Sequence, residues 1–270
     1  MDAEELRDRI AEFPRWHYRF KFDGGITTPV PNPGQINRHE QRRRYFFDAL
    51  LSLTGGSLAG RRVLDLGCNA GFWSLHAVEA GAEFVLGVDA QEQYIEQAQL
   101  VFEAKHVERE RYRFECANMF DHAFAGRFDV ILCLGMFEVV SKPVELFELM
   151  SRLGAETIVV DTGVSRMASS FFEVAKLDDA QARVDHEMVL IPTRQAVVEL
   201  AAEFGYETVA LAQNISDYAG MEDYHSGRRL AFICSRGAPL ERLTAARPEP
   251  ALSSWLPPAL QPLLTRARRG

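Results

Sequence analysis

The stretch from residue 61 to 90, RRVLDLGCNAGFWSLHAVEAGAEFVLGVDA, constrains the fold more than any other part of the chain. An apolar run ends in a turn that contains Gly67 and Gly71. A helix-like run follows, and a second apolar run then ends at Asp89. Continuous apolar strands separated by helical stretches are typical of a parallel sheet with helices on both faces. The stretch therefore predicts two parallel strands joined through a helix, with a glycine turn after the first strand.

The same alternation continues to about residue 236. We expect strands at 62–66, 84–89, 112–116, 128–134, 157–161, 206–212 and 229–235, and helices at 72–80, 91–105, 142–153 and 193–204. The loop NISDYAGMEDYHSG between the last two strands leaves no room for a helix, so the final strand should run antiparallel. The predicted fold class is α/β, with a doubly wound, seven-stranded, mostly parallel sheet.

Three segments are expected along the chain. Residues 1–56 form an N-terminal helical and aromatic cap, in which the Pro- and Gly-rich part PRWHYRFKFDGGITTPVPNPGQ separates two helices. Residues 57–236 form the ligand-binding domain. Residues 237–270 carry six prolines, end in TRARRG, and are predicted to be an exposed tail.

Composition excludes several classes of protein. The net charge of −8 argues against a protein that coats nucleic acid, because such proteins need many cations to neutralise phosphates. The four cysteines have no CxxC spacing, which predicts neither a disulfide framework nor a metal site. There is no apolar run of 18 residues, and the first residues lack the features of a signal peptide. We therefore expect a cytoplasmic protein without a membrane segment.

The glycine turn and the acid that follows the second strand point to a ligand. In doubly wound sheets ligands bind beyond the carboxyl ends of the strands. Gly67 permits a sharp turn, Gly71 lets the next helix begin close to a ligand, and Asn69 tolerates a left-handed backbone. Asp89 lies 18 residues after Gly71 and can accept hydrogen bonds from both hydroxyls of a ribose. A cofactor that contains a nucleoside is expected. NAD fits poorly because G-x-G-x-x-G is absent, and the alternative is a turn that only connects strand and helix.

The segments VLDLGCNAGFWS, VLGVDA, FDVILCLGMFE and RRLAFICS resemble the successive motifs of class I S-adenosylmethionine-dependent methyltransferases. The wider pattern is similar to the family of tRNA wobble-uridine carboxymethyltransferases and their small-molecule methyltransferase relatives. It includes a W-H with a downstream T-P near the N-terminus and LIPTRQAVVELAAEFGYETV. The resemblance implies a Rossmann-like methyltransferase fold, S-adenosylmethionine as cofactor and no metal. The cofactor-binding residues it implies are Asp65, Gly67, Cys68, Asn69 and Gly71 at the methionine end, Asp89 and Ala90 at the ribose, Asn118 and Met119 at the adenine, and Leu134 and Gly135 at the pocket border.

The chain departs from the carboxymethyltransferase pattern at three places. That family has a Tyr-His pair after the fourth strand, where this chain has Glu138 and Val139. It also has Lys and Trp upstream of the glycine turn, which NRHEQRRRYFFDALL lacks, and an arginine about where His186 stands. A glutamate that faced a carboxylated cofactor would repel it. We therefore expect ordinary S-adenosylmethionine and methyl transfer.

Glu138 and His186 are the predicted catalytic residues on the acceptor side. Glu138 is suited to orient or deprotonate an acceptor, and the alternative is a solvated acid at a helix start. His186 is suited to act as a general base near neutral pH, and the alternative is a loop histidine. Trp16, His17 and Tyr18 are predicted to cover the acceptor as an aromatic lid. The alternative for these three is a plug packed on the core.

Other residues are weaker candidates. Arg38, Arg42, Arg43 and Arg44 either grip a phosphate or an acidic substrate or form a solvated helix face, and Tyr224 and His225 lie in the loop before the last strand. The expected function is a methyltransferase for a small molecule, such as a natural product or a sugar-like acceptor, methylated on oxygen or nitrogen. A tRNA-modifying methyl or carboxymethyl transferase and a non-catalytic S-adenosylmethionine-binding protein are the alternatives. Nucleic acid is not the expected partner.

Overall fold

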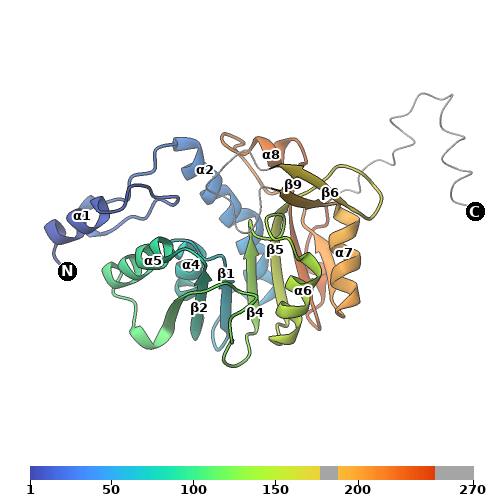
Figure 1. Cartoon of the computed structure of the whole chain (residues 1–270), viewed down its shortest axis with the longest axis horizontal. Coiled ribbons are helices and arrows are strands. Elements are labelled where there is room, and N and C mark those ends of the chain that lie inside the picture. Colours follow the sequence, from blue (N-terminus) through green and yellow to red (C-terminus); the bar gives the residue numbers. More distant parts are fainter. Residues whose placement is uncertain (177–187, 247–270) are drawn as a thin grey trace, which may run out of the picture.

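The main sheet has seven strands in the order β3-β2-β1-β4-β5-β9-β8 (Figure 1), in a computed structural model that describes residues 1–176 and 188–246. The strands are β1 (Arg62–Leu66), β2 (Phe84–Asp89), β3 (Tyr112–Cys116), β4 (Val130–Leu134), β5 (Thr157–Gly163), β8 (Glu207–Ala210) and β9 (Arg229–Ser235). Neighbouring strands from β3 to β5 pair in parallel, whereas β9 pairs antiparallel with both β5 and β8. The predicted fold class is confirmed, including the antiparallel last strand.

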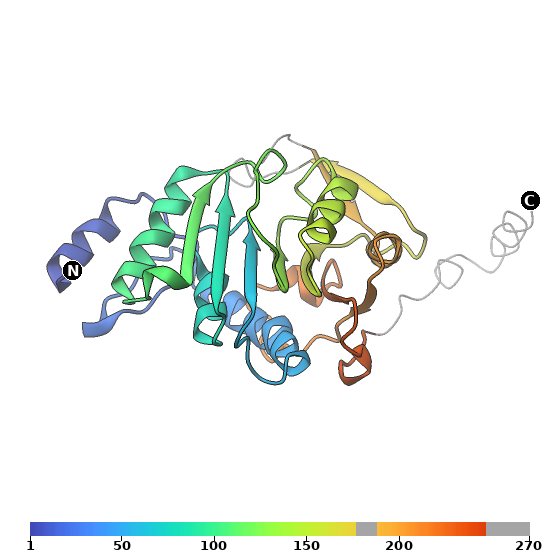
Figure 2. The same cartoon turned by 90° about the horizontal axis from the view of Figure 1, so that it is seen from below.

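Helices cover both faces of the sheet (Figures 1 and 2). On one face, α4 (Phe72–Glu79) and α5 (Glu92–Ala104) share a core with the N-terminal segment, including Trp73, Ile95 and Leu50. On the other face, α6 (Pro143–Arg152) and α7 (Arg194–Glu203) pack Leu146, Phe147 and Val197 into a second core. Because β4 lies at the centre and is buried on both faces, it is apolar throughout, whereas β1 beside it is apolar except for Arg62 and the buried Asp65.

The N-terminal segment contains α1 (Ala3–Ala11), α2 (Pro33–Arg42), a π-helical turn (Arg43–Phe47) and α3 (Asp48–Leu53). The Asn32 side chain caps α2 by accepting from the Gly34 amide, so the helix begins earlier than the sequence pattern indicates. In the π-helical turn, Tyr45, Phe46 and Phe47 are consecutive and all buried. These three aromatics belong to the domain core and so join the cap to it, whereas Arg44 in the same turn is exposed.

Residues 13–28 form a turn that is fixed on α4. The Thr28 hydroxyl donates to the Tyr18 carbonyl at 2.8 Å and accepts from the Phe20 amide at 2.8 Å. The Tyr18 ring stacks on Phe72, the first residue of α4, with ring centroids 4.6 Å apart. An antiparallel bridge between Lys21 and Thr27 closes this part of the chain into a hairpin-like shape.

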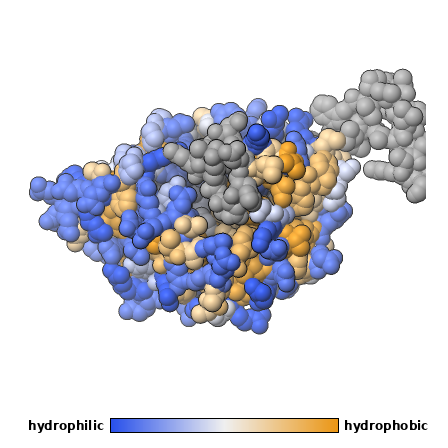
Figure 3. All heavy atoms as spheres, in the orientation of Figure 1, coloured by the Kyte–Doolittle hydropathy of each residue, from blue (hydrophilic) through white to orange (hydrophobic). Residues whose placement is uncertain are grey.

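A second, two-stranded sheet consists of β6 (Phe172–Lys176) and β7 (Met188–Pro192), which the sequence pattern does not predict. It lies beside the segment after β4, because the Leu190 amide donates to the Glu138 carbonyl at 3.0 Å. Val174 and Met188 are exposed on this sheet, on the side of the molecule where Figure 3 shows most of the apolar surface.

The predicted exposed tail begins differently from expectation. Within the described residues, the Ala212 amide donates to the Thr244 carbonyl and the Ala246 amide donates to the Ala210 carbonyl. Leu240 and Leu243 also pack against the core. These contacts arise because β8 is an edge strand whose free backbone groups need partners. The first part of the tail thus extends the sheet edge, and residues 247–270 lie outside the described residues.

Candidate functional site

The glycine turn lies at the carboxyl end of β1, where Gly67 and Cys68 donate their amides to the Val88 carbonyl at 2.8 and 3.1 Å. Gly67, Asn69 and Gly71 have φ angles of 69°, 49° and 74°, all in the left-handed region expected from the sequence. A Cβ on Gly67 would lie 2.4 Å from Met136 Sδ, so the turn needs glycine for space as well as for conformation. The turn therefore keeps the backbone open at the edge where a ligand would approach.

Asp89 ends β2 beside this turn. Its Oδ2 accepts from the Asn69 amide and its Oδ1 accepts from the Gln91 amide, both at 3.0 Å. Each carboxylate oxygen has a further lone pair, so the group can still accept from a pair of vicinal hydroxyls. Burial raises the pKa of Asp89, and the backbone amides of Gln91 and Asn69 oppose that shift. The orientation and spare acceptors of this carboxylate fit the ribose of S-adenosylmethionine.

Asp65 in β1 is buried below the turn and accepts from the Ser74 hydroxyl at 2.7 Å. Burial raises the pKa of Asp65 to about 7, the Ser74 hydrogen bonds oppose the shift, and the nearby charge of Asp89 adds to it. No ion pair to Asp65 forms within the described part of the chain. A buried carboxyl without a cation favours a positively charged ligand group, which suits the methionine end of the cofactor.

The other predicted cofactor residues lie at the same edge. The Asn118 side chain is held by hydrogen bonds to Asp121 Oδ2 at 2.8 Å and from the Phe120 amide at 3.1 Å. Met119 and Leu134 are buried, Ala90 is exposed, and Gly135 donates its amide to the Asp161 carbonyl at 2.8 Å. Cys68 is buried, and burial raises the pKa of its thiol, which indicates a packing role for this side chain. The structure therefore brings all of these positions together, while their roles remain predictions.

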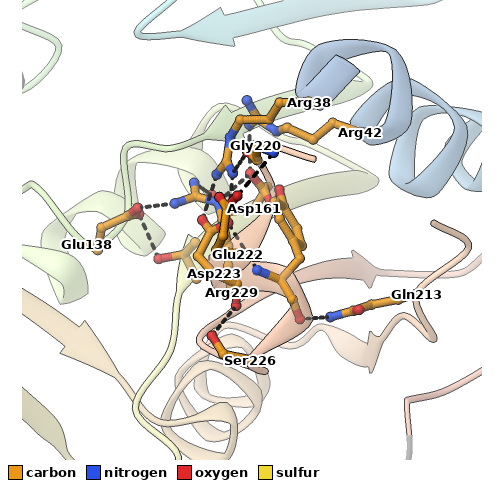
Figure 4. Close-up of polar contacts among 12 residues, drawn as sticks. Arg38, Arg42, Glu138, Asp161, Gln213, Gly220, Glu222, Asp223, Ser226 and Arg229 are labelled. Carbon is orange, nitrogen blue, oxygen red and sulfur yellow. Dashed lines mark hydrogen bonds and ion pairs between the residues drawn. The ribbon is translucent and has the colours of Figure 1, made fainter. Parts of the chain in front are cut away.

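Glu138 lies after β4 in a network of charged side chains that spans the ends of β4, β5 and β9 (Figure 4). Arg229 Nη1 donates to Glu138 Oε1 at 2.7 Å, and Arg229 Nε donates to Asp161 Oδ2 at 3.0 Å. The Thr162 hydroxyl donates to Glu138 Oε2 at 2.8 Å. Only 13% of the Glu138 side chain is exposed, so the alternative of a solvated acid at a helix start is wrong.

The network continues into the N-terminal cap through Arg42 of α2. Arg42 Nη2 donates to Asp161 Oδ2 at 2.6 Å, and the Tyr224 hydroxyl donates to Asp161 Oδ1 at 2.6 Å. Burial opposes ionisation of Asp161, but the guanidiniums of Arg229 and Arg42 outweigh it and hold the pKa of that carboxyl below its ordinary value. The carboxylate thus joins α2, β5 and β9 at one point.

This arrangement corrects the interpretation of the arginine cluster. Arg42 is buried, and Arg38 forms a bidentate pair with Asp223 at 2.6 and 2.7 Å, so neither lies on a solvated face or is free for a phosphate. Arg43 is half-buried and pairs with Asp48, and Arg44 is exposed. Arg38 and Arg42 are four residues apart and lie on one face of the helix, whereas Arg43 and Arg44 follow at steps of about 100° and turn away from it.

Sequence reasoning missed Asp161 and Arg229 and ranked Tyr224 low. The signal was present: Asp161 falls at the carboxyl end of a predicted parallel strand, and Arg229 begins the predicted antiparallel strand. Both positions must lie at the ligand-binding edge of such a sheet. Opposite charges at two such strand ends would have predicted the pair.

The remaining candidates have different outcomes. Trp16 is fully buried, and its Nε1 donates to the Ile10 carbonyl at 3.1 Å, which favours the core-packing alternative. Tyr18 is buried and His17 half-buried, and their rings pack together, 4.6 Å between centroids. Burial raises the pKa of Tyr18 to about 12, the nearby charge of Arg42 opposes that shift, and the charges of Asp65 and Asp161 add to it. His225 is exposed, and His186 lies outside the described residues.

The sheet order, the glycine turn and the acid at the end of β2 define a Rossmann-like, class I S-adenosylmethionine-dependent methyltransferase fold. The family comparison agrees: residues 63–156 match the family described as Methyltransferase domain. The match covers the segment from β1 to the start of β5, which contains every predicted cofactor-binding position. This match does not show the link to tRNA carboxymethyltransferases.

The curated relatives match over the same part of the chain. The ubiquinone biosynthesis O-methyltransferase of Neisseria meningitidis serogroup A is 37% identical over 98 residues, which is 36% of this chain and 40% of that protein. The protein of the same name from Acinetobacter baylyi is 33% identical over 98 residues, 36% of this chain and 41% of that protein. The similarity thus spans about two fifths of the length of these relatives.

Solved structures resemble the chain over a greater length. The N-terminal domain of EvdMO1, solved in the presence of S-adenosylhomocysteine and D-fucose, has a TM-score of 0.68 and 20% identity and covers 87% of this chain and 97% of that one. Magnesium protoporphyrin IX methyltransferase from Synechocystis with bound S-adenosylmethionine has a TM-score of 0.55 and 15% identity, with coverage of 87% and 91%. At these identities the likeness shows the fold.

Two kinds of feature are absent from the described residues. No group of three or more His, Cys, Asp or Glu among them is arranged to hold a metal ion. Within the same residues, no helix has the length and apolarity needed to cross a membrane.

Proposed function

We propose that the chain is an S-adenosylmethionine-dependent methyltransferase that acts on a small hydroxyl- or amine-bearing acceptor. The observation that carries this proposal is the adjacency of two differently built regions at one sheet edge. Asp65, Asp89 and the glycine turn fit the cofactor, and the network of Glu138, Asp161 and Arg229 lies next to them at the ends of β4 and β5. Gly135, a predicted cofactor-binding residue, lies beside the network, because a Cβ there would be 3.3 Å from Arg229 Nη2.

The reaction proposed is a direct displacement. When bound, the cofactor supplies a sulfonium-bound methyl group. The acceptor atom forms a bond to the methyl carbon as the carbon–sulfur bond breaks, and S-adenosylhomocysteine leaves with the electron pair of that bond. The chain must hold the acceptor in line, exclude water and take up the proton of a neutral acceptor. Glu138 is proposed to accept that hydroxyl or amine hydrogen, because Thr162 and Arg229 fix both of its oxygens in place.

The charges of the network favour an acceptor without a net negative charge. Arg42 and Arg229 are balanced by Asp161 and Glu138 in a buried setting, so an anionic acceptor would find no unpaired cation there. The similar ubiquinone biosynthesis O-methyltransferases and the D-fucose present with the EvdMO1 domain support a hydroxylated acceptor by analogy. A sugar-like or phenolic hydroxyl is therefore the proposed acceptor class.

The tRNA alternative is weakened by the same geometry. Arg38 and Arg42, which would have to contact phosphates, are committed to internal carboxylates. Glu138, which stands where the carboxymethyltransferases have their Tyr-His pair, would oppose a carboxylated cofactor. A non-catalytic cofactor-binding protein stays as the alternative that only turnover excludes.

Calorimetry with the purified chain tests the cofactor first. We expect binding of S-adenosylmethionine and S-adenosylhomocysteine, and none of NAD. Incubation with methyl-labelled S-adenosylmethionine and panels of hydroxylated sugars and phenols then tests transfer, with Glu138→Gln compared against the exposed Glu145→Gln as control. We expect the first variant alone to lose label transfer, by about a hundredfold or more, with cofactor affinity within a few-fold. Absence of heat with both adenosyl ligands would refute the assignment.

A further inference from the structure

A groove of about 280 Å³ lies on the flank of the domain, between the N-terminal segment, α2 and α4, and we call it the α4 groove. Its apolar wall includes Phe20, Phe72 and Leu75. Its polar rim includes Arg19, Lys21 and Lys105. Phe72 begins α4 at the cofactor edge and Glu79 ends it, so the groove runs along the helix away from that edge. A ligand in this groove would be distinct from the cofactor.

His39 of α2 lines the α4 groove and is 3% exposed. Neither of its ring nitrogens makes a hydrogen bond of normal geometry to a described residue. Its ring packs instead against Tyr18, His17 and Phe72, with centroids 4.3 to 5.6 Å away. Burial, and then the neighbouring charges of His17, Arg42 and Arg38, hold the pKa of His39 well below its ordinary value. A neutral imidazole presents one donor and one acceptor, and a buried polar group without a partner is costly.

The charges around the α4 groove favour an anion. Four cationic side chains line it, namely Arg19, Lys21, Arg43 and Lys105, against the carboxylates of Glu40 and Glu79. Arg43 is paired with Asp48 at 3.0 Å, and Glu79 is engaged by His76 at 3.1 Å. Among the described residues, Arg19, Lys21 and Lys105 have no carboxylate within ion-pair distance. Three cations without a carboxylate partner among the described residues, of which Lys105 also lies over the Phe22 ring, therefore line an aromatic wall in a chain whose net charge is −8.

We propose that the α4 groove is a second ligand site, which binds a small organic anion with an apolar or aromatic body. The body lies on Phe20, Phe72 and Leu75, and the carboxylate, phosphate or sulfonate is held by Arg19, Lys21 and Lys105. The imidazole of His39 supplies a hydrogen bond at the closed end. This site does not depend on methyl transfer, and it stands whether or not the proposed function holds.

Binding of 8-anilinonaphthalene-1-sulfonate to the full chain tests the proposal, because this probe joins an aromatic body to one anionic group. Fluorescence and calorimetry are performed with saturating S-adenosylhomocysteine, so that failure of the cofactor site is read separately. We expect one probe per chain, binding at least tenfold weaker in Arg19→Glu/Lys21→Glu and a few-fold weaker in His39→Phe. The matched control Arg7→Glu/Lys142→Glu changes two cations outside the groove and should leave affinity within twofold.

Three outcomes would overturn the proposal. The first is equal probe affinity in the groove variant and the control. The second is probe binding that occurs without S-adenosylhomocysteine and is lost when that ligand is saturating, which would place the probe at the cofactor edge. The third is salt-sensitive binding of tRNA that is lost in Arg19→Glu/Lys21→Glu while the probe does not bind, which would assign the groove to nucleic acid. Circular dichroism of each variant distinguishes unfolding from loss of binding. If His39→Phe does not fold, Arg19→Glu/Lys21→Glu alone tests the proposal.

Discussion

Replacement of Asp161 by asparagine should destabilise the fold strongly. The Asp161 carboxylate is fully buried and accepts from Arg42, Arg229 and Tyr224 at 2.6, 3.0 and 2.6 Å. Asparagine keeps the shape of the side chain but removes the negative charge. Arg229 would keep Glu138 as a counter-charge, but the Arg42 guanidinium, whose side chain is only 6% exposed, would be left in a buried site without one.

The size of the effect follows from that burial. Removing one partner of a buried ion pair typically costs about 3–5 kcal/mol, because an uncompensated charge is left behind. For a domain of this size, 1 kcal/mol corresponds to a shift in melting temperature of about 2–4 °C, so we expect a fall of roughly 6–20 °C. Since the folded pKa of Asp161 is depressed, its contribution is fully present above about pH 4, the unfolded value, and is lost as the pH falls through the folded pKa.

Urea unfolding at pH 7 and pH 3.5 measures this loss, with Asp48→Asn as the matched control. Asp48 pairs with Arg43, but their side chains are 48% and 38% exposed, so its loss should cost about 0–1 kcal/mol. We expect the two variants to differ by at least about 2 kcal/mol at pH 7 and to converge toward pH 3.5. Equal, small losses for both variants at pH 7 would refute the claim that the buried network holds α2 on the sheet edge.

Three other outcomes are expected. Asp89→Ala should weaken S-adenosylhomocysteine binding by roughly 1–3 kcal/mol in calorimetry, since the ribose hydroxyls lose a charged acceptor, and unchanged affinity would contradict its role. Asp65→Asn should flatten the pH dependence of stability: the folded pKa of about 7 lies above the unfolded value, so wild-type stability is fully present below about pH 4 and falls as the pH rises to about 7. The free energy of unfolding is measured with urea at pH 5 and pH 8. An equal change between the two pH values in wild type and variant would exclude this role of Asp65. No tRNA binding is expected at physiological salt, and a gel shift abolished by Arg43→Ala/Arg44→Ala would contradict that expectation.

The main sheet could be predicted because its signals are local. Each central strand is buried on both faces and reads as a short apolar run, and each is followed by a helix with its own start and stop signals. The pair β6 and β7 escaped prediction because it is not part of the core: Glu173, Val174 and Lys176 are exposed, so no apolar pattern marks the strand. The π-helical turn was missed because its cause is tertiary, namely the enclosure of three consecutive aromatics.

The candidate site was predictable on the cofactor side and much less so on the acceptor side. Gly67, Gly71 and Asp89 have spacings fixed by one strand–helix–strand unit, so sequence distance sets their place in space. Asp161 and Arg42 are 119 residues apart, and their contact depends on how the N-terminal helix docks. A charge run such as the one that contains Arg42 reads as a solvated face unless the buried partner is known. Long-range ion pairs between segments of this kind leave no periodic signal in a single sequence.

The two buried acids at the sheet edge, Asp65 and Asp161, have opposite surroundings. This contrast supports the proposed division of the site into a cofactor side and an acceptor side. Among the described residues, Asp65 receives hydrogen bonds from Ser74 but no cation, and burial raises the pKa of its carboxyl to about 7. Asp161 receives two guanidiniums and a phenol, and the pKa of its carboxyl is held below the ordinary value. An uncompensated acid gains stability from a cationic ligand, whereas a neutralised network gains none. A cofactor that carries an ammonium and a sulfonium is therefore favoured beside Asp65. The acceptor favoured beside Asp161 and Glu138 is an uncharged group that binds through hydrogen bonds alone.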